Sequence, residues 1–150
     1  MEVYESLRLS NQLCFPLYLC SKEIIGRYTP FLKPLDLTYT QYIVMMYLWE
    51  QQHSNISDMG KALLLDTNTL TPLLQKLEAK GYIERQKSPN DGREMIIALT
   101  ERGYALRTEA TKIPELMRTC INLTPEEAEI LYKLLYKVLL NLEGGKHDNH

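Results

Sequence analysis

Three cysteines are the side chains of this sequence with the most specific chemistry. Cys14 and Cys20 lie near the N-terminus, and Cys120 follows 106 residues after Cys14. A cysteine thiolate is a nucleophile that a peroxide oxidises to a sulfenic acid, which a second thiol converts to a disulfide. The stretch "NQLCFPLYLC" therefore raises a choice for Cys14 between a small apolar residue of a core and a thiol placed to react.

The spacing of the cysteines and histidines argues against other uses of a thiol. Six residues along a helix place Cys14 and Cys20 about 240° apart around its axis, so we expect no disulfide between them. Cys20 is interpreted as buried filler. The histidines stand at 53, 147 and 150, and with the cysteines they form no C-x-x-C or H-x-x-x-H ligand pattern. We therefore predict neither a metal site nor a cofactor.

The composition is that of an ordinary globular domain. The chain has 150 residues, of which 45% are hydrophobic and 24% charged, with a net charge of −2. Its longest apolar run, "YIVMMYLW", is too short to cross a membrane, and the N-terminus has no secretory signal pattern. We therefore expect a cytoplasmic protein without membrane contact, in which the cysteines are reduced.

The apolar periodicity predicts a mainly helical chain with one pair of strands. Thr100 and the sequence "TPEE" at 124–127 are typical helix starts, and "PNDG" at 89–92 is a strong turn signal. Ser10 and Ser57 are candidate N-caps of earlier helices. Helices are expected over about 10–32, 38–52, 57–65, 66–80, 101–121 with a break near Pro114, and 125–142, and strands over 82–88 and 93–99.

The helix before Gly81 has the clearest amphipathic pattern. Its apolar residues recur at the spacing of one helix face, and the opposite face carries short polar and cationic side chains. Its start stays open, because Thr71 and Pro72 suit the first two positions of a helix but a helix that begins earlier can also hold the proline. The apolar residues are Leu70, Leu73, Leu74 and Leu77, and the polar ones are Thr69, Thr71, Gln75 and Lys76.

A short helix, a turn, an amphipathic helix and a two-stranded hairpin follow one another in the order of a winged helix-turn-helix. In that arrangement the second helix enters the major groove of DNA, and an arginine near the hairpin turn can reach a minor groove. An ordinary solvated helix face and surface hairpin is the alternative, because Glu84, Asp91 and Glu94 partly offset the cations. The candidate DNA-binding residues are Asn68, Thr69, Thr71, Gln75, Lys76, Arg85, Lys87, Asp91 and Arg93.

At these residues the sequence resembles a known family. "DGREMIIALTERG" resembles the D-x-R-x(5)-L-T-x-x-G wing signature of MarR-type transcription regulators, and "DTNTLTPLLQKLEAKGYIERQKSPNDGRE" resembles their recognition helix and wing. "LSNQLCFPLYLCSKEIIGRYTPFLKPLDLTYTQYIVMMYLWE" is similar to the OhrR-type repressors that sense organic hydroperoxides and to their staphylococcal thiol-sensing relatives. The resemblance covers roughly residues 7–142.

The resemblance implies a mainly α fold with a small β-hairpin wing (α+β), a winged helix-turn-helix dimerised through its N- and C-terminal helices. One MarR-type domain then fills residues 1–150. The DNA-binding part spans about 38–100, the dimerisation helices span about 7–32 and 101–142, and 143–150 is expected to be a disordered tail. The wide apolar stripe of the last helix also suggests burial against a partner chain. The stripe consists of Ile130, Leu131, Leu134, Leu135, Val138, Leu139 and Leu142.

The resemblance also assigns the thiol site. It implies that Cys14 is the redox-sensing thiol, that Tyr28 and Tyr39 of the partner chain hydrogen-bond its thiolate, and that Asp91 pairs with Arg93 in the wing. The residues agree with a partner's contribution, since Cys14 and Tyr28 are separated by ~21 Å along one straight helix. Pro16 favours either a helix that starts near Cys14 or a kinked one.

The predicted function is that of a repressor. A reduced homodimer binds a pseudo-palindromic operator in double-stranded DNA. An organic hydroperoxide oxidises Cys14, and the oxidised repressor is then released from the operator. Cys120 is the candidate resolving cysteine of the partner chain, with a packed thiol as the alternative; an inert Cys120 would leave the sulfenic acid to a low-molecular-weight thiol. A MarR-type repressor relieved by a small aromatic ligand, with Cys14 structural, is the alternative function. We expect no enzyme, because the sequence has no loop typical of a thiol peroxidase.

Overall fold

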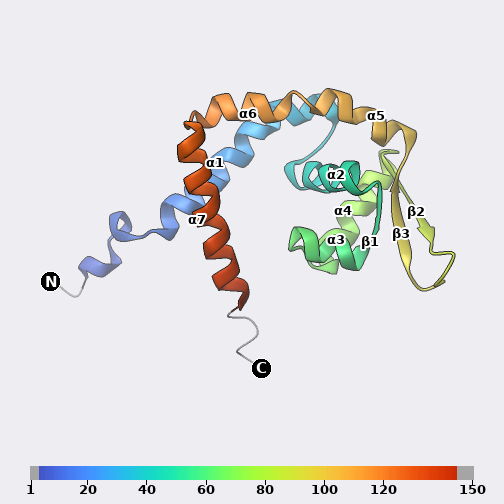
Figure 1. The fold of residues 1–150 in the computed structure, drawn as a ribbon, viewed down its shortest axis with the longest axis horizontal. Helices are drawn as coiled ribbons and strands as arrows, with labels where there is room; N and C mark the ends of the chain where they lie inside the picture. The colour runs from blue at the N-terminus through green and yellow to red at the C-terminus, as the bar shows by residue number, and fades with distance from the viewer. Residues whose placement is uncertain (1–3, 145–150) are drawn as a thin grey trace. The chain divides into compact units, whose positions relative to one another are not determined.

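The computed structural model describes residues 4–144, and the chain divides into two units, one ending at Pro114 and one beginning at Glu115. In the first unit, a group of short helices and a small sheet follow one long helix (Figure 1). The winged helix-turn-helix prediction is confirmed. The helices are α1 (Cys14–Leu32), α2 (Tyr39–Gln51), α3 (Ile56–Leu63), α4 (Thr67–Ala79), α5 (Glu101–Ala110), α6 (Ile113–Ile121) and α7 (Pro125–Gly144), and short 3-10 helices span Glu5–Leu7, Leu9–Asn11 and Lys33–Leu35.

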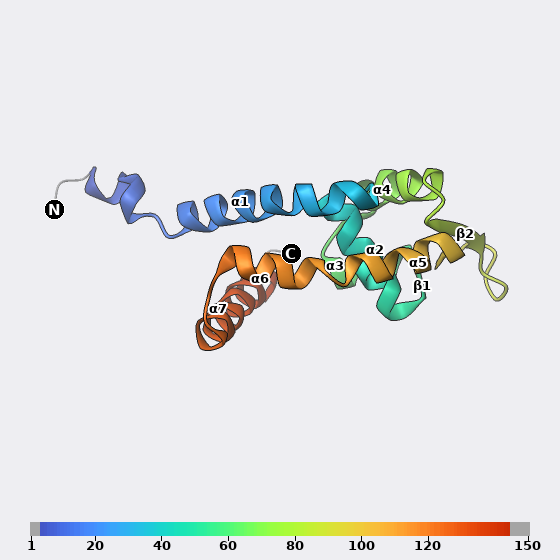
Figure 2. The same cartoon turned by 90° about the horizontal axis from the view of Figure 1, so that it is seen from above.

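The sheet has three strands, one more than the sequence predicted. β2 (Ile83–Lys87) and β3 (Met95–Leu99) form the expected antiparallel hairpin, and β1 (His53–Asn55) pairs with the other edge of β3, giving the order β1-β3-β2. The loop between β2 and β3 projects away from the helices in both ribbon views (Figure 2). β3 is thus paired with a strand on each side, and this pairing fixes the base of the wing.

The core of the first unit joins α2, α3, α4 and the sheet. The four leucines predicted to face inward from α4, at 70, 73, 74 and 77, are all buried, and they meet Met59 of α3 and Ile97 of β3 in this core. On α2 the sequence pattern predicts an apolar face of Tyr39, Ile43, Met46 and Tyr47, and this prediction is wrong: Val44, Met45 and Leu48 are buried, whereas Met46 is exposed. Because residues 42–49 are all apolar, the pattern did not identify the inner face.

Side-chain caps fix where the helices begin. Thr38 and Gln41 form a capping box on α2, and Thr100 caps α5, as expected for such residues. The cap of α3 is Asn55, not the predicted Ser57: the Asn55 side chain accepts from the Asp58 N–H at 2.7 Å. Asp66 caps α4, so this helix begins before Thr71 and holds Pro72 inside it.

The N-terminal helix begins later than predicted. Ser10 lies in the 3-10 helix Leu9–Asn11 and is not the N-cap of α1, which starts at Cys14. Pro16 then occupies the third helical position, where its missing N–H removes no intrahelical hydrogen bond. The proline therefore places Cys14 at the first position of a helix that runs unbroken to Leu32.

One glycine allows the two ends of the hairpin to close on α5. A Cβ at Gly103 would lie 1.9 Å from the carbonyl oxygen of Tyr82, so only glycine lets these backbones approach. Its N–H donates to Thr100 Oγ1 at 3.0 Å, and its carbonyl accepts from Trp49 Nε1 at 2.9 Å. The Leu-Thr-x-x-Gly part of the wing signature thus has a direct structural reason.

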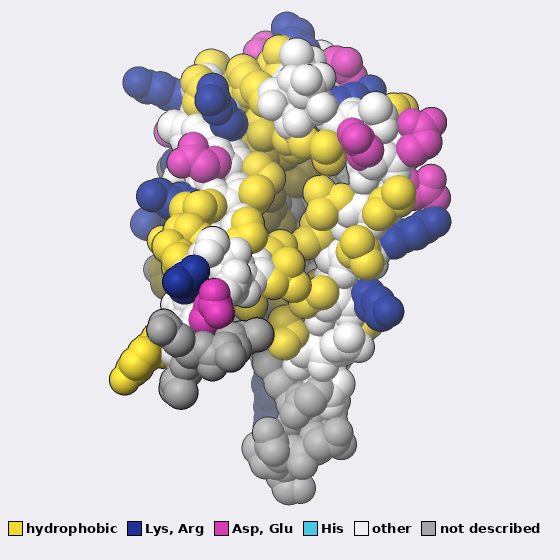
Figure 3. Space-filling view, turned by 90° about the vertical axis from the view of Figure 1, so that its left-hand side faces the viewer, with side chains coloured by type: hydrophobic (Ala, Val, Ile, Leu, Met, Phe, Trp, Pro, Cys, Tyr) yellow, Lys and Arg dark blue, Asp and Glu magenta, His cyan; other side chains and the backbone are white. Residues whose placement is uncertain are grey.

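The second unit carries the apolar surface that the sequence predicted. Helices α5 and α6 are separated at Thr111 and Lys112, next to Pro114, and the Thr124–Glu127 capping box opens α7. No residue of α7 between Pro125 and Gly144 is buried. Hydrophobic side chains are widely exposed on the face drawn in Figure 3. Of the predicted disordered tail, 143 and 144 belong to α7, and 145–150 lie outside the described residues.

No helix between residues 4 and 144 combines the length and the hydrophobicity that crossing a bilayer requires.

Candidate nucleic-acid interface and thiol site

Helix α4 presents a polar face opposite its buried leucines. Asn68, Thr69, Gln75 and Lys76 are exposed, and Thr71 is half-buried. These side chains offer the short hydrogen-bonding groups and the cation that read base edges and bind phosphates in a major groove. The structure therefore places all five predicted residues on the helix that a winged helix-turn-helix inserts into DNA.

The wing places its own cations around a tight turn. Arg93 and Lys87 are exposed, and the Asp91 carboxylate accepts from the Arg93 backbone N–H at 3.0 Å. The Ser88 N–H donates to the Glu94 carbonyl at 2.8 Å and closes the loop. The contact between Asp91 and Arg93 thus fixes the turn through the backbone, and the arginine side chain remains exposed beside it.

Arg85 has a partner that the sequence did not predict. Its guanidinium donates two hydrogen bonds to the Glu78 carboxylate, from Nε at 3.0 Å and from a terminal nitrogen at 3.1 Å. These bonds lower the pKa of Glu78 and raise that of Arg85. The pair joins α4 to β2, so Arg85 holds the recognition helix against the wing in this structure, and its predicted contact with DNA stays a prediction.

An open cleft of about 650 Å³ lies between α3, the start of α4 and the base of the wing. Lys61, Thr67 and Arg93 line it together with the Asn55–Glu94 contact, in which Asn55 Nδ2 donates to Glu94 Oε1 at 2.6 Å. Asn55 also caps α3, so one side chain joins the helix-turn-helix to the wing. Lys61 and Asn55 therefore also belong to the candidate DNA-binding surface, although the sequence analysis did not select them. The only hint of Asn55 in the sequence was an asparagine, a common helix cap, two residues before the predicted cap Ser57.

Cys14 is exposed at the first position of α1. The first turn of this helix contains no acidic side chain, and Leu13 provides no side-chain cap. This thiol is therefore accessible to a small oxidant in the single chain, at the N-terminal end of a helix.

Tyr28 and Tyr39 lie together on neighbouring helices. Their ring centroids are 4.8 Å apart, and Tyr42 stands 5.7 Å from Tyr28. Burial raises the pKa of Tyr28 and of Tyr39, and raises that of Tyr42 to about 12 with the help of its two neighbours. All three hydroxyls therefore remain protonated donors at neutral pH. Tyr42 was not predicted as part of this group.

The structure does not bring Tyr28 to Cys14 of its own chain. Because α1 is continuous from Cys14 to Leu32, the two residues are separated by ~21 Å of helical rise. Cys20 is exposed, so the prediction of buried filler is wrong for the single chain. Cys120 is exposed too, in the last turn of α6. Between residues 4 and 144 no group of three or more potential ligand side chains is placed to hold a metal ion.

Comparison with known proteins agrees with this geometry. The family model described as "Transcriptional regulator SarA/Rot" matches residues 27–109. The organic hydroperoxide resistance transcriptional regulator of Bacillus subtilis (strain 168) is 38% identical over 139 residues, which are 93% of this chain and 95% of that protein. The HTH-type transcriptional regulator SarZ of Staphylococcus aureus (strain USA300) is 44% identical over 124 residues, covering 83% of this chain and 84% of SarZ.

Solved structures show the same fold bound to DNA. Reduced AbfR bound to DNA superposes with a TM-score of 0.77 at 34% identity, covering 92% of this chain and 96% of AbfR. A mutant MarR of E. coli complexed with operator DNA superposes with a TM-score of 0.80 at 27% identity, covering 93% and 99% of the two chains. With its winged helix-turn-helix and these relatives, the chain belongs to the MarR family of DNA-binding transcription regulators, in the OhrR-type group that also relates to SarA/Rot proteins.

Proposed function

We propose that this regulator is a homodimeric repressor whose release from DNA is controlled by oxidation of Cys14. The observation that carries the proposal is the arrangement around α1. An exposed thiol occupies the first position of α1, and two half-buried phenols lie together at the other end of this helix, Tyr28 on α1 itself and Tyr39 at the start of α2. A second chain is needed to bring such phenols to the thiol, and they are the donors that a thiolate there would accept from.

The proposed chemistry takes place at one sulfur atom. The Cys14 thiolate attacks the terminal oxygen of an organic hydroperoxide and the O–O bond breaks, so that the sulfur becomes a sulfenic acid and the leaving alkoxide takes a proton from water to give an alcohol. The Cys120 thiol of the partner chain then displaces hydroxide from this sulfur, which gives a disulfide and water. If Cys120 is inert, a low-molecular-weight thiol completes the same step.

The consequence for DNA follows from the position of the thiol. A sulfur atom joined to another thiol no longer accepts hydrogen bonds from Tyr28 and Tyr39, so the helices that carry these residues change their packing. We propose that the two α4 helices then lose the separation that matches two operator half-sites. Support comes from the relatives: one is named for organic hydroperoxide resistance, and AbfR has been solved reduced, overoxidized and with a disulfide formed.

Substitution of Cys14 tests the proposal. The Cys14→Ser protein should bind the operator as tightly as the wild type, and an organic hydroperoxide should release only the wild type, as measured by fluorescence anisotropy of labelled operator. Cys20→Ser is the matched control and should be released normally. A Cys14→Ser protein that the peroxide still releases would exclude Cys14 as the sensor. Peptide mapping of the oxidised wild type without reductant then decides between a Cys14–Cys120 disulfide and a small-thiol adduct.

A second candidate function has one supporting observation. A cleft of about 360 Å³ lies between α1 and the start of α2, lined by apolar side chains and Tyr39 together with two threonines, the Asp36 carboxylate and the cations Lys33 and Lys80. It has the size for a small aromatic compound, which would relieve repression without oxidation. Release of the Cys14→Ser protein from operator by a phenolic acid such as salicylate would favour this function.

A further inference from the structure

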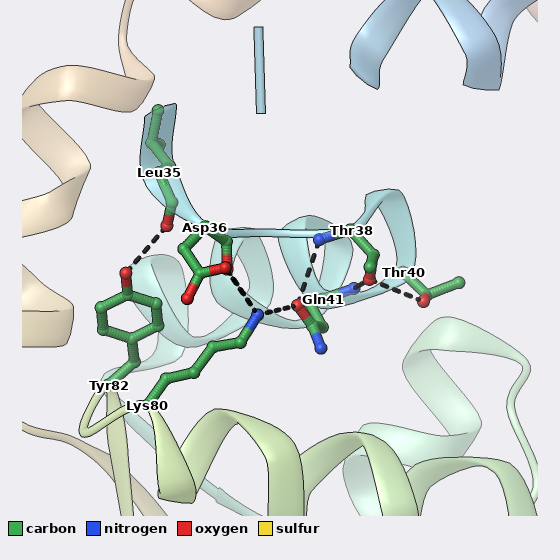
Figure 4. Close-up of polar contacts among 7 residues, drawn as sticks. All are labelled: Leu35, Asp36, Thr38, Thr40, Gln41, Lys80 and Tyr82. Atoms are coloured by element: carbon green, nitrogen blue, oxygen red, sulfur yellow. Dashed lines mark hydrogen bonds and ion pairs between the residues drawn. The ribbon is translucent and has the colours of Figure 1, made fainter. Parts of the chain in front are cut away.

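The last residue of the recognition helix is tied to a distant segment of the first unit. Lys80 closes α4, and its ammonium donates to the Asp36 carbonyl at 2.6 Å and to Gln41 Oε1 at 2.9 Å, while the Asp36 carboxylate lies 3.5 Å away (Figure 4). The Lys80 side chain is only 23% exposed. Its charge is therefore largely surrounded by oxygen atoms of residues 36–41, which comprise the end of the connection after α1 and the first residues of α2.

Both acceptors have a structural role of their own. Asp36 ends the 3-10 helix after α1 in a left-handed conformation with φ of 54°. Gln41 is buried, and the same Oε1 atom that accepts from Lys80 also accepts from the Thr38 N–H at 3.1 Å within the capping box of α2. Tyr39 stands between Thr38 and Gln41 in the chain. Lys80 thus contacts residues 36–41 on both sides of Tyr39.

A second contact lies next to the first. The Tyr82 hydroxyl donates to the Leu35 carbonyl at 2.8 Å, and this bond is buried (Figure 4). Tyr82 follows Gly81 at the turn that leads from α4 into the wing. The end of the recognition helix is therefore held to residues 35–41 by one charged and one neutral side chain.

We propose that Lys80 is a positioning residue that couples residues 36–41, which include Tyr39 at the start of α2, to the orientation of α4. An ammonium that is mostly removed from water strongly favours keeping its acceptors. When residues 36–41 shift, Lys80 and the end of α4 must follow, or the acceptors are lost. The inference rests on the proposed function for its trigger, a change at Tyr28 and Tyr39, but the coupling itself is a property of this one contact.

The test measures operator affinity of reduced and peroxide-treated protein for the wild type, Lys80→Met, Lys80→Arg and Lys33→Met. Methionine keeps the aliphatic stem and removes the donors, arginine keeps a charged donor, and Lys33 is an exposed lysine on the same cleft. In Lys80→Met the ratio of oxidised to reduced dissociation constants should fall by about threefold to thirtyfold. Lys80→Arg should restore part of the ratio, and Lys33→Met should leave it unchanged.

Two outcomes would overturn the inference. One is an unchanged ratio in Lys80→Met. The other is a loss of operator affinity that is equal in both redox states, together with a slope of log affinity against log salt concentration that is smaller by about one. A direct contact between Lys80 and a DNA phosphate would produce this result. If the peroxide fails to release even the wild type, the proposed function fails instead, and hydrogen exchange then decides on Lys80.

Hydrogen exchange of the reduced protein needs no oxidant. Lys80→Met should speed amide exchange both at residues 77–82 and at residues 37–42, while Lys33→Met leaves both segments as in the wild type. Faster exchange at the first segment alone would mean that Lys80 merely ends its helix, and the coupling would be wrong. Thermal unfolding of each variant confirms that all of them are folded.

Discussion

The helix-turn-helix with its wing and the helices α1 and α7 differ in how much of their structure one chain completes. Between α2 and α5 the leucines of α4 are covered, the helix starts have caps, and Asn55 and Arg85 join the helices to the wing. In contrast, α7 has no buried residue, and α1 buries only Leu32. A single chain therefore buries the core of the DNA-binding part, whereas it leaves the apolar side chains of the part proposed to sense the oxidant uncovered.

This difference indicates which helices the partner chain of the proposed dimer would cover. A helix with apolar side chains over most of its surface is stable in water only when another surface covers it. In the middle of α7 the charged residues Glu129, Lys133 and Lys137 follow one line, with an ion pair of 2.7 Å between the first two. Sensing and dimerisation are thus expected to use the same helices, and DNA recognition is expected to depend on them for the spacing of two copies.

The largest effect is expected from a charge in the middle of the α7 apolar face. Leu131→Glu should convert the dimer to a monomer, because the carboxylate would be buried without a partner. Operator affinity should fall by about 10²- to 10⁴-fold, since two linked half-site contacts become separate ones. Light scattering and anisotropy check this, with Lys137→Gln on the charged line as the control. A dimeric Leu131→Glu protein would contradict the role of α7.

A smaller effect is expected from the completed part of the chain. Gly103→Ala places a methyl group against the Tyr82 backbone and should lower the free energy of unfolding by about 3 kcal/mol. Urea denaturation followed by Trp49 fluorescence measures it, because the Trp49 indole bonds to residue 103. Gly92→Ala, where nothing lies within 4 Å of the added atom, should change stability by less than about 1 kcal/mol. Equal effects of the two substitutions would show that the close approach is not needed.

The smallest effect concerns the tyrosine group. Tyr42 keeps its proton up to a pKa of about 12 in the folded chain and releases it near 10 when unfolded. Its contribution to stability is therefore complete below pH 10 and is lost as the pH rises from 10 to about 12. Urea midpoints between pH 9 and 12 should fall less steeply for Tyr42→Phe than for the wild type or for Tyr18→Phe, which removes an exposed phenol. Parallel slopes for all three would contradict the burial of this hydroxyl.

Local chemistry made part of this structure predictable. The leucine spacing of α4, the left-handed Gly81, the Thr100 cap and the Thr124 capping box all depend on residues close in sequence, and the structure contains them as expected. The turn signal and the alternating strands predicted the hairpin of the wing, and the resemblance to MarR-type regulators then identified its family. For these elements, near neighbours and family pattern led to the same result.

Tertiary contacts decided the rest. β1 is three residues long and is a strand only because β3 lies beside it, so no alternation marks it in the sequence. Asn55, the cap of α3 in place of Ser57, also donates to Glu94, 39 residues further along the chain. The Arg85–Glu78 pair and the Lys80 contacts likewise join distant segments. Cys20 was expected to be buried because free cysteines often are, but one chain provides nothing to cover it.

The unbroken course of α1 from Cys14 to Leu32 has a further consequence for the proposed sensor. Because the thiol and Tyr28 lie at opposite ends of one continuous helix, each dimer would contain two composite sensor sites, and each site would combine the thiol of one subunit with the tyrosines of the other. A hybrid dimer of one wild-type and one Cys14→Ser chain would keep one working site. Dilution below the dimer dissociation constant would separate the parts of both sites, so the response to an oxidant would depend on the concentration of the protein in the cell.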